Sequence, residues 1–197
     1  EGLGHEIHPL ERFESADLAG LDALILTVPY WPYVETDGIR QYSAEEMAAI
    51  RDFVNRRAVF LGDSSLWYDQ GDRPITFGDN RRLLENSLRF VLKGGGGIFL
   101  GDGGTYNDIM NFNELVAPYG VYFGPAFHDS DGYTINGGLA TGDIVRHEVT
   151  EGITQIGVDY YWSMQVQPPS IELMKGDNRN HVLAIYEVAE PTGACLL

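Results

Sequence analysis

Two apolar segments of this chain end in the same Gly-Asp dipeptide, and small residues follow each of them. "VFLGD" covers residues 59–63 and leads into Ser64, while "IFLGD" covers residues 98–102 and leads into glycines. A serine in such a turn is a candidate nucleophile, and Asp63 and Asp102 are candidates for acid/base chemistry. The alternative is that these side chains only order the turns by bonding to backbone N–H groups.

The first turn, residues 62–65, and the segment "GTYND", residues 104–108, together resemble the SGNH esterases. In that family a Gly-Asp-Ser turn supplies the nucleophile, and a Gly-x-Asn-Asp loop supplies a donor to the oxyanion. The resemblance implies these roles for Ser64 and Asn107, with His147 or His181 as the base. The pattern departs from the family in three ways. Each histidine follows an aspartate one residue too far away, Tyr106 is inserted in the asparagine loop, and two apolar strands precede the serine turn.

The segment "HDSDGYTING", residues 128–137, is the one place that suits a cation. Asp129, Asp131 and Asn136 offer alternating oxygen ligands around a glycine turn, which is the donor set that calcium prefers. The complete EF-hand pattern is absent, so a plain Asx-rich turn is the alternative. The five histidines show no zinc-site spacing. We expect no organic cofactor, and calcium is the only metal that the pattern suggests.

The charge balance disfavours nucleic acid and anionic membranes as partners. The formal net charge is −16, from 13 basic and 29 acidic residues. Phosphate backbones need Lys and Arg to neutralise them, so nucleic acid is disfavoured, as are anionic membrane surfaces. No apolar run is long enough for a transmembrane helix. The single cysteine, Cys195, excludes an internal disulfide framework. The chain opens without Met, so we expect a processed or truncated N-terminus.

Strand-like and helix-like segments alternate from about residue 5 to residue 124, and this alternation predicts a mostly parallel sheet with helices on both faces. A capping box opens the first helix at Ser43, and the second opens near Asp79 or Asn80. The apolar faces of the three helices are predicted to be Met47, Ile50 and Val54; Leu84, Leu88 and Val91; and Ile109, Phe112 and Val116.

Residues 121–123 are predicted to form a short strand, and residues 124–142 a long loop. Short β-like runs follow and should add strands, some of them antiparallel. The chain is expected to be one domain over residues 1–197. Its alternating core would cover residues 1–124, and its loop-rich and β-rich part residues 125–197. Because ligands of open α/β sheets bind at the carboxyl ends of the strands, both Gly-Asp turns should meet at that edge.

Four segments resemble the class I glutamine amidotransferase-like superfamily, in its non-catalytic branch. They are "LAGLDALILTVP" (residues 18–29), "SAEEMAAIRDFVNRRAVFLGD" (43–63), "NELVAPYGVYFG" (113–124) and "RHEVTEGI" (146–153). The resemblance implies a flavodoxin-like sheet, and His147 would order a loop near the sheet edge. An amidotransferase needs a cysteine on the turn after a strand, but both Gly-Asp turns lack one. We therefore expect no glutaminase activity.

Two functions from different classes remain. We favour a non-catalytic binding or assembly module of a larger protein or complex, with a protein or carbohydrate partner and a secreted or cell-envelope location. The alternative is a hydrolase at the same edge. Aromatic residues after the predicted strands suit stacking on sugars or anchoring an interface. The ligand-edge candidates are Asp63, Ser64, Trp67, Asp102, Gly103, Tyr106 and His147.

Overall fold

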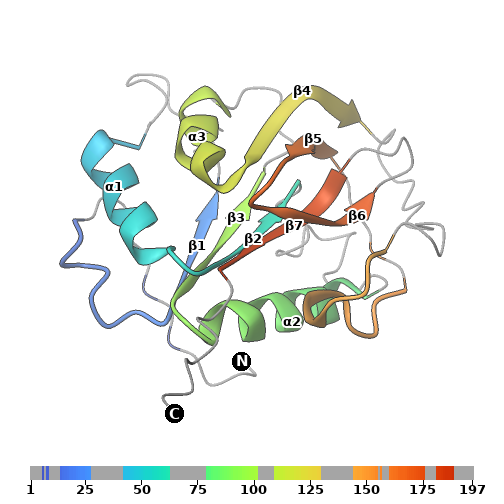
Figure 1. Cartoon of the computed structure of the whole chain (residues 1–197), viewed down its shortest axis with the longest axis horizontal. Coiled ribbons are helices and arrows are strands. Elements are labelled where there is room, and N and C mark those ends of the chain that lie inside the picture. The colour runs from blue at the N-terminus through green and yellow to red at the C-terminus, as the bar shows by residue number, and fades with distance from the viewer. Residues whose placement is uncertain are drawn as a thin grey trace, which may run out of the picture.

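A computed structural model describes residues 6, 8, 14–27, 42–62, 79–101, 109–129, 144–154, 156, 160–175 and 181–188 (Figure 1). Its strands are β1 (Ala23–Thr27), β2 (Arg57–Leu61), β3 (Gly96–Leu100), β4 (Val121–Asp129), β5 (Tyr160–Val166), β6 (Ile171–Lys175) and β7 (His181–Glu187). Its helices are α1 (Ala44–Phe53), α2 (Asn80–Leu92) and α3 (Ile109–Val116), with short 3-10 turns η2 (Ala117–Tyr119) and η3 (Glu148–Thr150).

The described strands form one mixed sheet in the order β1-β3-β2-β7-β5-β4, with β6 also paired to β7. The strands β1, β3 and β2 are parallel, as the alternation predicts, whereas β7, β5, β4 and β6 join antiparallel. The expectation of a mostly parallel sheet therefore holds for three strands. A parallel neighbour needs a long crossover, usually a helix, and no helix longer than one turn follows α3 in the described residues.

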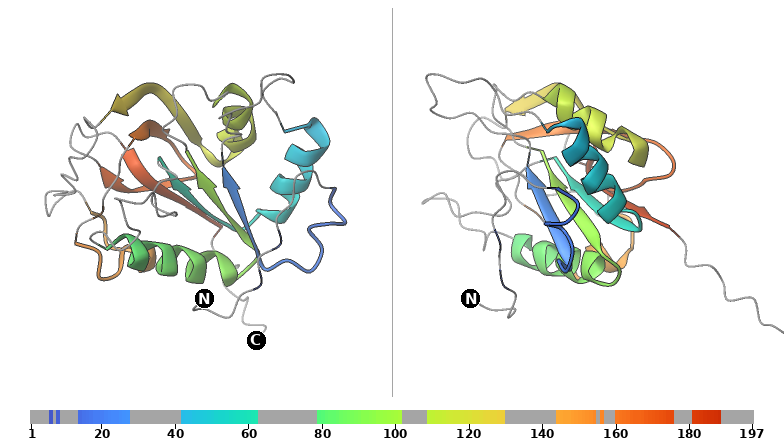
Figure 2. Two further views of the ribbon diagram at one scale, coloured as in Figure 1. Left: turned by 180° about the vertical axis from the view of Figure 1, so that it is seen from behind. Right: turned by 90° about the vertical axis from the view of Figure 1, so that its left-hand side faces the viewer.

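Helices cover both faces of the parallel strands. The helices α1 and α3 lie on one face and α2 on the other (Figures 1 and 2). From β1 the chain passes over β3 to reach β2, and it then steps back to β3 on the opposite face. The second connection runs in the opposite direction across the sheet and on the opposite face. The two connections therefore have the same handedness, as expected from the right-handed rule for such crossovers. Arg51 of α1 joins the two helices on the first face, because its Nη2 donates to the carbonyl of Glu114 at 2.6 Å.

Alternate side chains of the central strands feed two separate cores. Phe60 of β2 and Phe99 of β3 stack at 5.0 Å between their ring centroids on the α1 and α3 face. Val59 and Ile98 point to the α2 face, where they join a second cluster. All four side chains are fully buried. Burial on both faces explains why these strands read as continuous apolar runs instead of alternating ones.

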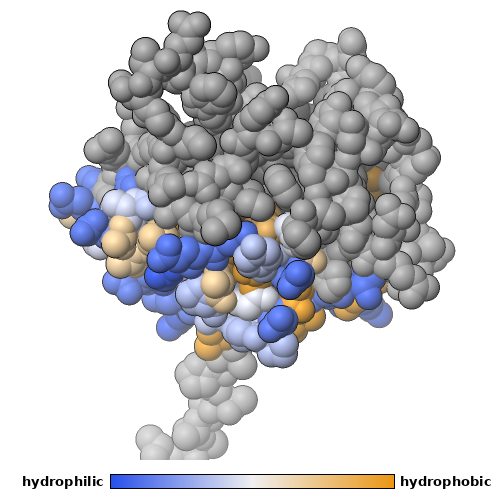
Figure 3. All heavy atoms as spheres, turned by 90° about the horizontal axis from the view of Figure 1, so that it is seen from above, coloured by the Kyte–Doolittle hydropathy of each residue, from blue (hydrophilic) through white to orange (hydrophobic). Residues whose placement is uncertain are grey.

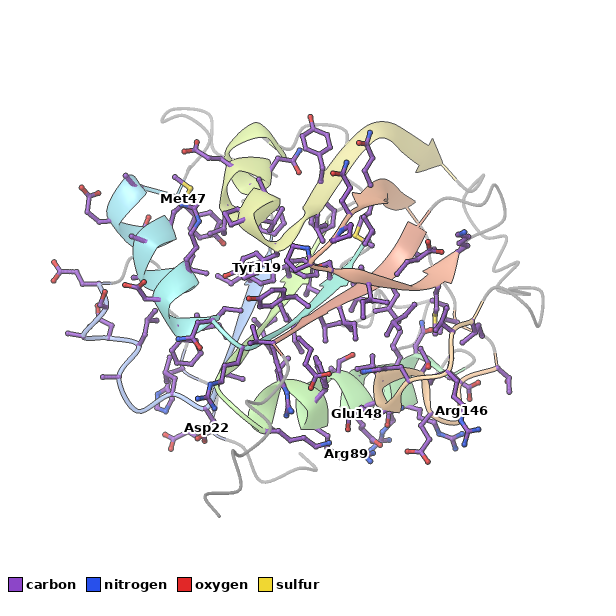
Figure 4. All side chains as sticks on the ribbon, viewed as in Figure 1. Asp22, Met47, Arg89, Tyr119, Arg146 and Glu148 are labelled. Carbon is purple, nitrogen blue, oxygen red and sulfur yellow. The ribbon has the colours of Figure 1, made fainter. Side chains whose placement is uncertain are left out.

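Tyr119 completes the first core (Figure 4). Its ring lies 5.7 Å from that of Phe60 and 5.6 Å from that of Phe99. Its hydroxyl donates to the carbonyl of Val54, just after α1, at 2.9 Å. Burial raises the pKa of this phenol well above its ordinary value of 10.0. The side chain is therefore a neutral hydrogen-bond donor that holds the end of α1 against the sheet.

The predicted helix starts are confirmed, but one predicted face is not. The Ser43 hydroxyl accepts from Glu46 N at 3.1 Å, and the Glu46 carboxylate accepts from Ser43 N at 2.9 Å. The helix α2 begins at Asn80. Its buried stripe contains Leu83 and Val91, as well as the residues Asn86, Ser87 and Phe90. The predicted Leu84 and Leu88 are only half-buried. Because Asn86 and Ser87 are polar, the apolar spacing alone did not indicate which face of α2 is buried.

Strand β4 is longer than predicted, because it continues through Gly124 and Pro125 to Asp129. Its pairing with β5 shifts register between Phe123 and Phe127. The buried side chain of Asn113 on α3 pairs with the backbone of Phe123 at this point. Its Nδ2 donates to the Phe123 carbonyl at 2.8 Å, and its Oδ1 accepts from Phe123 N at 2.7 Å. The amide thus bonds to β4 as a neighbouring strand would, next to the irregular pairing.

Candidate functional site

The two Gly-Asp segments leave the sheet side by side. Leu61 of β2 and Leu100 of β3 share the register of one parallel pair. Beyond them, Gly101 N donates to the Leu61 carbonyl at 2.7 Å. A Cβ at Gly101 would lie only 2.8 Å from the Gly62 carbonyl oxygen, so a larger residue would separate the two strand ends. The prediction that these strands are neighbours and run in the same direction is confirmed up to the two glycines.

The carboxyl end also receives the beginning of β7. Gly62 N donates to the carbonyl of Val182 at 3.0 Å. His181, the residue before Val182, is the first residue of β7, which runs antiparallel to β2. The structure therefore brings the backbone of His181 to the same end of the sheet as the first Gly-Asp turn.

Most of the predicted site residues lie outside the described residues. These are Asp63, Ser64, Trp67, Asp102, Gly103, Tyr106, Asn107, Asp131 and Asn136. Asp129 and His181 are described through their backbone, as the last residue of β4 and the first of β7. The geometry of the serine, the oxyanion donor and the calcium ligands therefore stays a prediction. In the described part of the chain, no three His, Cys, Asp or Glu side chains are grouped so that they could hold a metal ion.

His147 orders the turn that follows it. Its Nδ1 accepts from Val149 N at 3.1 Å, and the hydroxyl of Thr150 accepts from His147 N at 2.9 Å. These reciprocal bonds form a capping box at the start of η3. Thr150 is held in turn by the Val145 carbonyl, 2.6 Å from its hydroxyl. The loop-ordering role that the resemblance implies for His147 is therefore confirmed.

The position of His147 differs from the one expected. Its ring meets that of Phe90 edge-on at 5.4 Å, and the guanidinium of Arg57 lies 5.3 Å from the same Phe90 ring. Arg57 is the first residue of β2 and is ion-paired to Glu187 at 3.0 Å. The structure therefore places His147 near the beginning of β2, whereas the Gly-Asp turn follows the end of that strand.

The electrostatic surroundings of His147 favour the neutral imidazole. Burial lowers its pKa, the carboxylates of Glu148 and Glu187 oppose this, and Lys93 and Arg57 lower it again. The net result is a pKa below the ordinary value of 6.5. Because Nδ1 accepts a backbone hydrogen bond, the proton of the neutral ring is on Nε2. This side chain is a cap in its present geometry, with no free ring nitrogen to act as a base.

Helix α2 holds the whole turn through one line of polar side chains. The Nδ2 of Asn86 donates to the carbonyls of Val149 at 3.2 Å and Glu151 at 2.9 Å. One turn earlier, Arg82 Nη1 donates to the Gly152 carbonyl at 2.7 Å.

Both ends of the same line add a contact to this turn. At its start the Asp79 carboxylate accepts from Thr154 N at 2.7 Å and from the Thr154 hydroxyl at 2.9 Å. At its end Lys93 forms an ion pair with Glu148. The segment 147–154 is thus fixed along the entire length of the helix.

The motif "HEVTEGI", residues 147–153, therefore has a structural explanation. Val149 is fully buried and Ile153 nearly so, both in the α2 core. Gly152 has φ +69°, where a side chain is strained, and a Cβ there would lie 2.8 Å from Arg82 Nη1. The partners of this motif on α2 were not among the predicted site residues. They are Asp79, Arg82, Asn86 and Lys93, and successive members are three, four and seven residues apart. This spacing places polar residues along one side of a helix, and it could have indicated their shared role.

Replacing His147 with asparagine should reduce the dependence of stability on pH. Asparagine keeps an oxygen that can cap the turn but does not titrate. The unfolded chain binds a proton on this histidine more readily than the folded one, because the folded pKa is lowered. Stability of the wild type should therefore fall as pH drops through about 6.5 towards the folded pKa. Urea unfolding at several pH values between about 8 and 5 measures this.

The control is Gln165→Asn at an exposed position of β5, which changes no titratable group and should leave the pH profile of unfolding unchanged. A His147→Asn variant that loses as much stability in acid as the wild type would contradict the assignment.

Gly152→Ala should destabilise the protein more than Gly95→Ala. Both glycines have positive φ, +69° and +62°, so the backbone strain of about 1–2 kcal/mol is shared. Only at position 152 does the new Cβ meet a neighbour, Arg82. Chemical denaturation of the two variants measures the difference. The excess cost at position 152 should shrink when Arg82 is also replaced by alanine. Equal costs at both glycines would show that the contact with Arg82 carries no weight.

Comparison with known proteins adds one distant structural likeness. No protein-family model and no curated protein matches the chain. One solved structure, described as "mmIFT52 N-terminal domain", matches with a TM-score of 0.48 and 13% sequence identity over 88% of this chain. The match covers 66% of that structure's own chain, just under two thirds of its length. None of the described helices is long and apolar enough to cross a membrane.

Proposed function

We propose that this chain is a non-catalytic, flavodoxin-like module of the amidotransferase-like kind, which binds a partner at the carboxyl end of its parallel strands. The observation that carries the proposal is the hydrogen bond from Gly101 N to the Leu61 carbonyl, which holds Gly101 beside Gly62 at the ends of β2 and β3. Two loops that begin at neighbouring residues can form one surface. In open α/β sheets the crevice beyond the carboxyl ends of the strands is where ligands bind.

The residue types at this edge support binding over glutaminase chemistry. Neither "GDSS", residues 62–65, nor "GDGG", residues 101–104, supplies a thiol. Cys195 belongs to neither of these two turns. His147 is committed to capping η3.

The partner proposed for this edge is a protein or a carbohydrate. Trp67 and Tyr106 follow the two Gly-Asp turns in the sequence, and aromatic side chains suit both kinds of partner. The proposed setting is a larger protein or complex that is secreted or belongs to the cell envelope. Calcium at Asp129, Asp131 and Asn136 would be an additional element of this proposal, with oxygen ligands only.

The experiment is a binding comparison of Trp67→Ala with Tyr106→Ala, singly and together, against Val188→Ala. Val188 is exposed and bonds through its N–H to the Arg56 carbonyl, beside the beginning of β2, so it lies at the opposite end of that strand. A glycan array identifies a carbohydrate ligand, and cross-linking to copurified proteins identifies a protein ligand. The aromatic variants should lose about tenfold or more in affinity for the ligand found, while Val188→Ala should keep it. Equal affinity in all variants would remove the carboxyl edge as the binding site.

A second candidate function, ester hydrolysis by Ser64, is favoured by one observation. The beginning of β7 puts His181 next to Val182, whose carbonyl bonds to Gly62 N, two residues before the serine. His181 is thus the better of the two candidate bases.

Hydrolysis of a chromogenic ester separates the two functions in the same set of proteins. Under the hydrolase alternative, Ser64→Ala and His181→Gln should each abolish turnover, while His147→Gln should keep it. Under the binding proposal the wild type has no turnover to lose.

A further inference from the structure

The basic residues of this acidic chain are unevenly distributed. Thirteen Lys and Arg face 29 Asp and Glu over the whole chain. Among the described residues, five exposed cations lie on α2, just after it or on the segment 144–154 that packs against it. We call them the α2 basic face: Arg81, Arg82, Arg89, Lys93 and Arg146. Arg89 and Arg146 appear in Figure 4 on the α2 side of the molecule, away from α1 and α3. A concentration of this kind needs an explanation in a chain with so few cations.

The arginines of this face are accessible. The side chains of Arg81 and Arg89 are 67% and 66% exposed, and Lys93 is 50% exposed. Arg81 and Arg89 share a single carboxylate, that of Glu85, at 3.2 and 3.9 Å. One carboxylate neutralises only one of two guanidinium groups. Each guanidinium also has five N–H donors in a fixed fork, so most of the donors remain available for a bidentate partner.

The charge of this face contrasts with that of the remaining chain. Among the described residues of α2 and of the segment 144–154, with Asp79 before the helix, the carboxylates are Asp79, Glu85, Glu148 and Glu151. These five cations and four carboxylates sum to a net charge of +1. All other residues of the chain therefore sum to −17, which gives the formal net charge of −16.

The opposite side of the sheet shows the reverse pattern. Glu45, Asp52 and Glu114 are exposed on α1 and α3, where Arg51 is bound to the end of α3. Figure 3, which views the molecule from above Figure 1, shows mostly hydrophilic described residues between separate hydrophobic areas, without distinguishing acids from bases.

We propose that the α2 basic face is a docking surface for an acidic segment of a partner protein. Arginine forks match carboxylate pairs in geometry as well as in charge. The exposed carboxylates of α1 and α3 repel such a segment, which favours its approach to the α2 side of the sheet. Charges more than about 8 Å away are screened at physiological ionic strength, so the local cations decide the contact despite the net charge. This proposal concerns the α2 side of the sheet, whereas the proposed function concerns the loops at the carboxyl ends of β2 and β3.

The test uses the double variant Arg89→Gln with Arg146→Gln. Both side chains lie on the described surface, and neither fills a core. The probe is a fluorescein-labelled peptide rich in Asp and Glu, and its affinity is measured by fluorescence anisotropy at about 0.15 M salt. The double variant should bind about fivefold or more weakly than the wild type, since each exposed pair contributes a modest amount. A lysine-rich peptide should not compete for the face.

The control is Gln165→Glu with Gln167→Glu, at two exposed positions on or just after β5. It changes the net charge by the same two units but leaves α2 intact, so its affinity should stay near that of the wild type. Circular dichroism and the melting temperature verify that both double variants fold.

The proposal is overturned by any of three results. The wild type could fail to bind the acidic peptide, or the two double variants could weaken binding equally, which would reflect net charge alone. The third result is a self-associating wild type whose association is lost only in the arginine variant. A second copy, with its acidic α1 and α3 side, would then be the occupant.

Discussion

The parallel pairing of β2 with β3, buried on both faces, is the constraint on which the remaining structure depends. Phe60, Phe99, Val59 and Ile98 have no exposed surface. Strands of this kind are stable only if helices cover each face, which requires α1 and α3 on one side and α2 on the other. The same pairing fixes the register in which Leu61 meets Leu100. It therefore also decides that the two Gly-Asp turns begin next to each other.

Features with a strong local signal could be predicted from the sequence. The continuous apolar runs gave the three parallel strands, and the reciprocal spacing of Ser43 and Glu46 gave the start of α1. Gly120, with φ +78°, ends η2 in a conformation that glycine adopts without strain. In each case a few neighbouring residues carry the information. The loop-ordering expected of His147 also depends on residues close in sequence, because its capping box pairs it with Val149 and Thr150.

Features that depend on distant partners could not be predicted in this way. Asn113 looks like an ordinary polar helix residue until the backbone of Phe123 lies beside it. Asn86 and Ser87 are buried in α2 although they are polar, so the apolar spacing pointed to Leu84 and Leu88 instead. The place of His147 near the beginning of β2 depends on how the segment 147–154 packs on α2. Antiparallel strands after α3 were predicted, but their order, with β7 beside β2 and β4 at the edge, depends on partners that are distant in the sequence.

The way in which α2 holds the segment 147–154 has a consequence for how this fold changes in evolution. Arg82 and Asn86 bond to main-chain oxygens of Gly152, Val149 and Glu151, which every amino acid possesses. Substitutions at the exposed Glu151 are therefore nearly neutral to this attachment, while the helix side of the contact tolerates few changes. Most side chains of the turn can therefore change during evolution while its hydrogen bonds to α2 are kept. The ancestry of such a chain is then recorded in a few scattered pairs of positions, which a search along a single stretch of sequence does not detect.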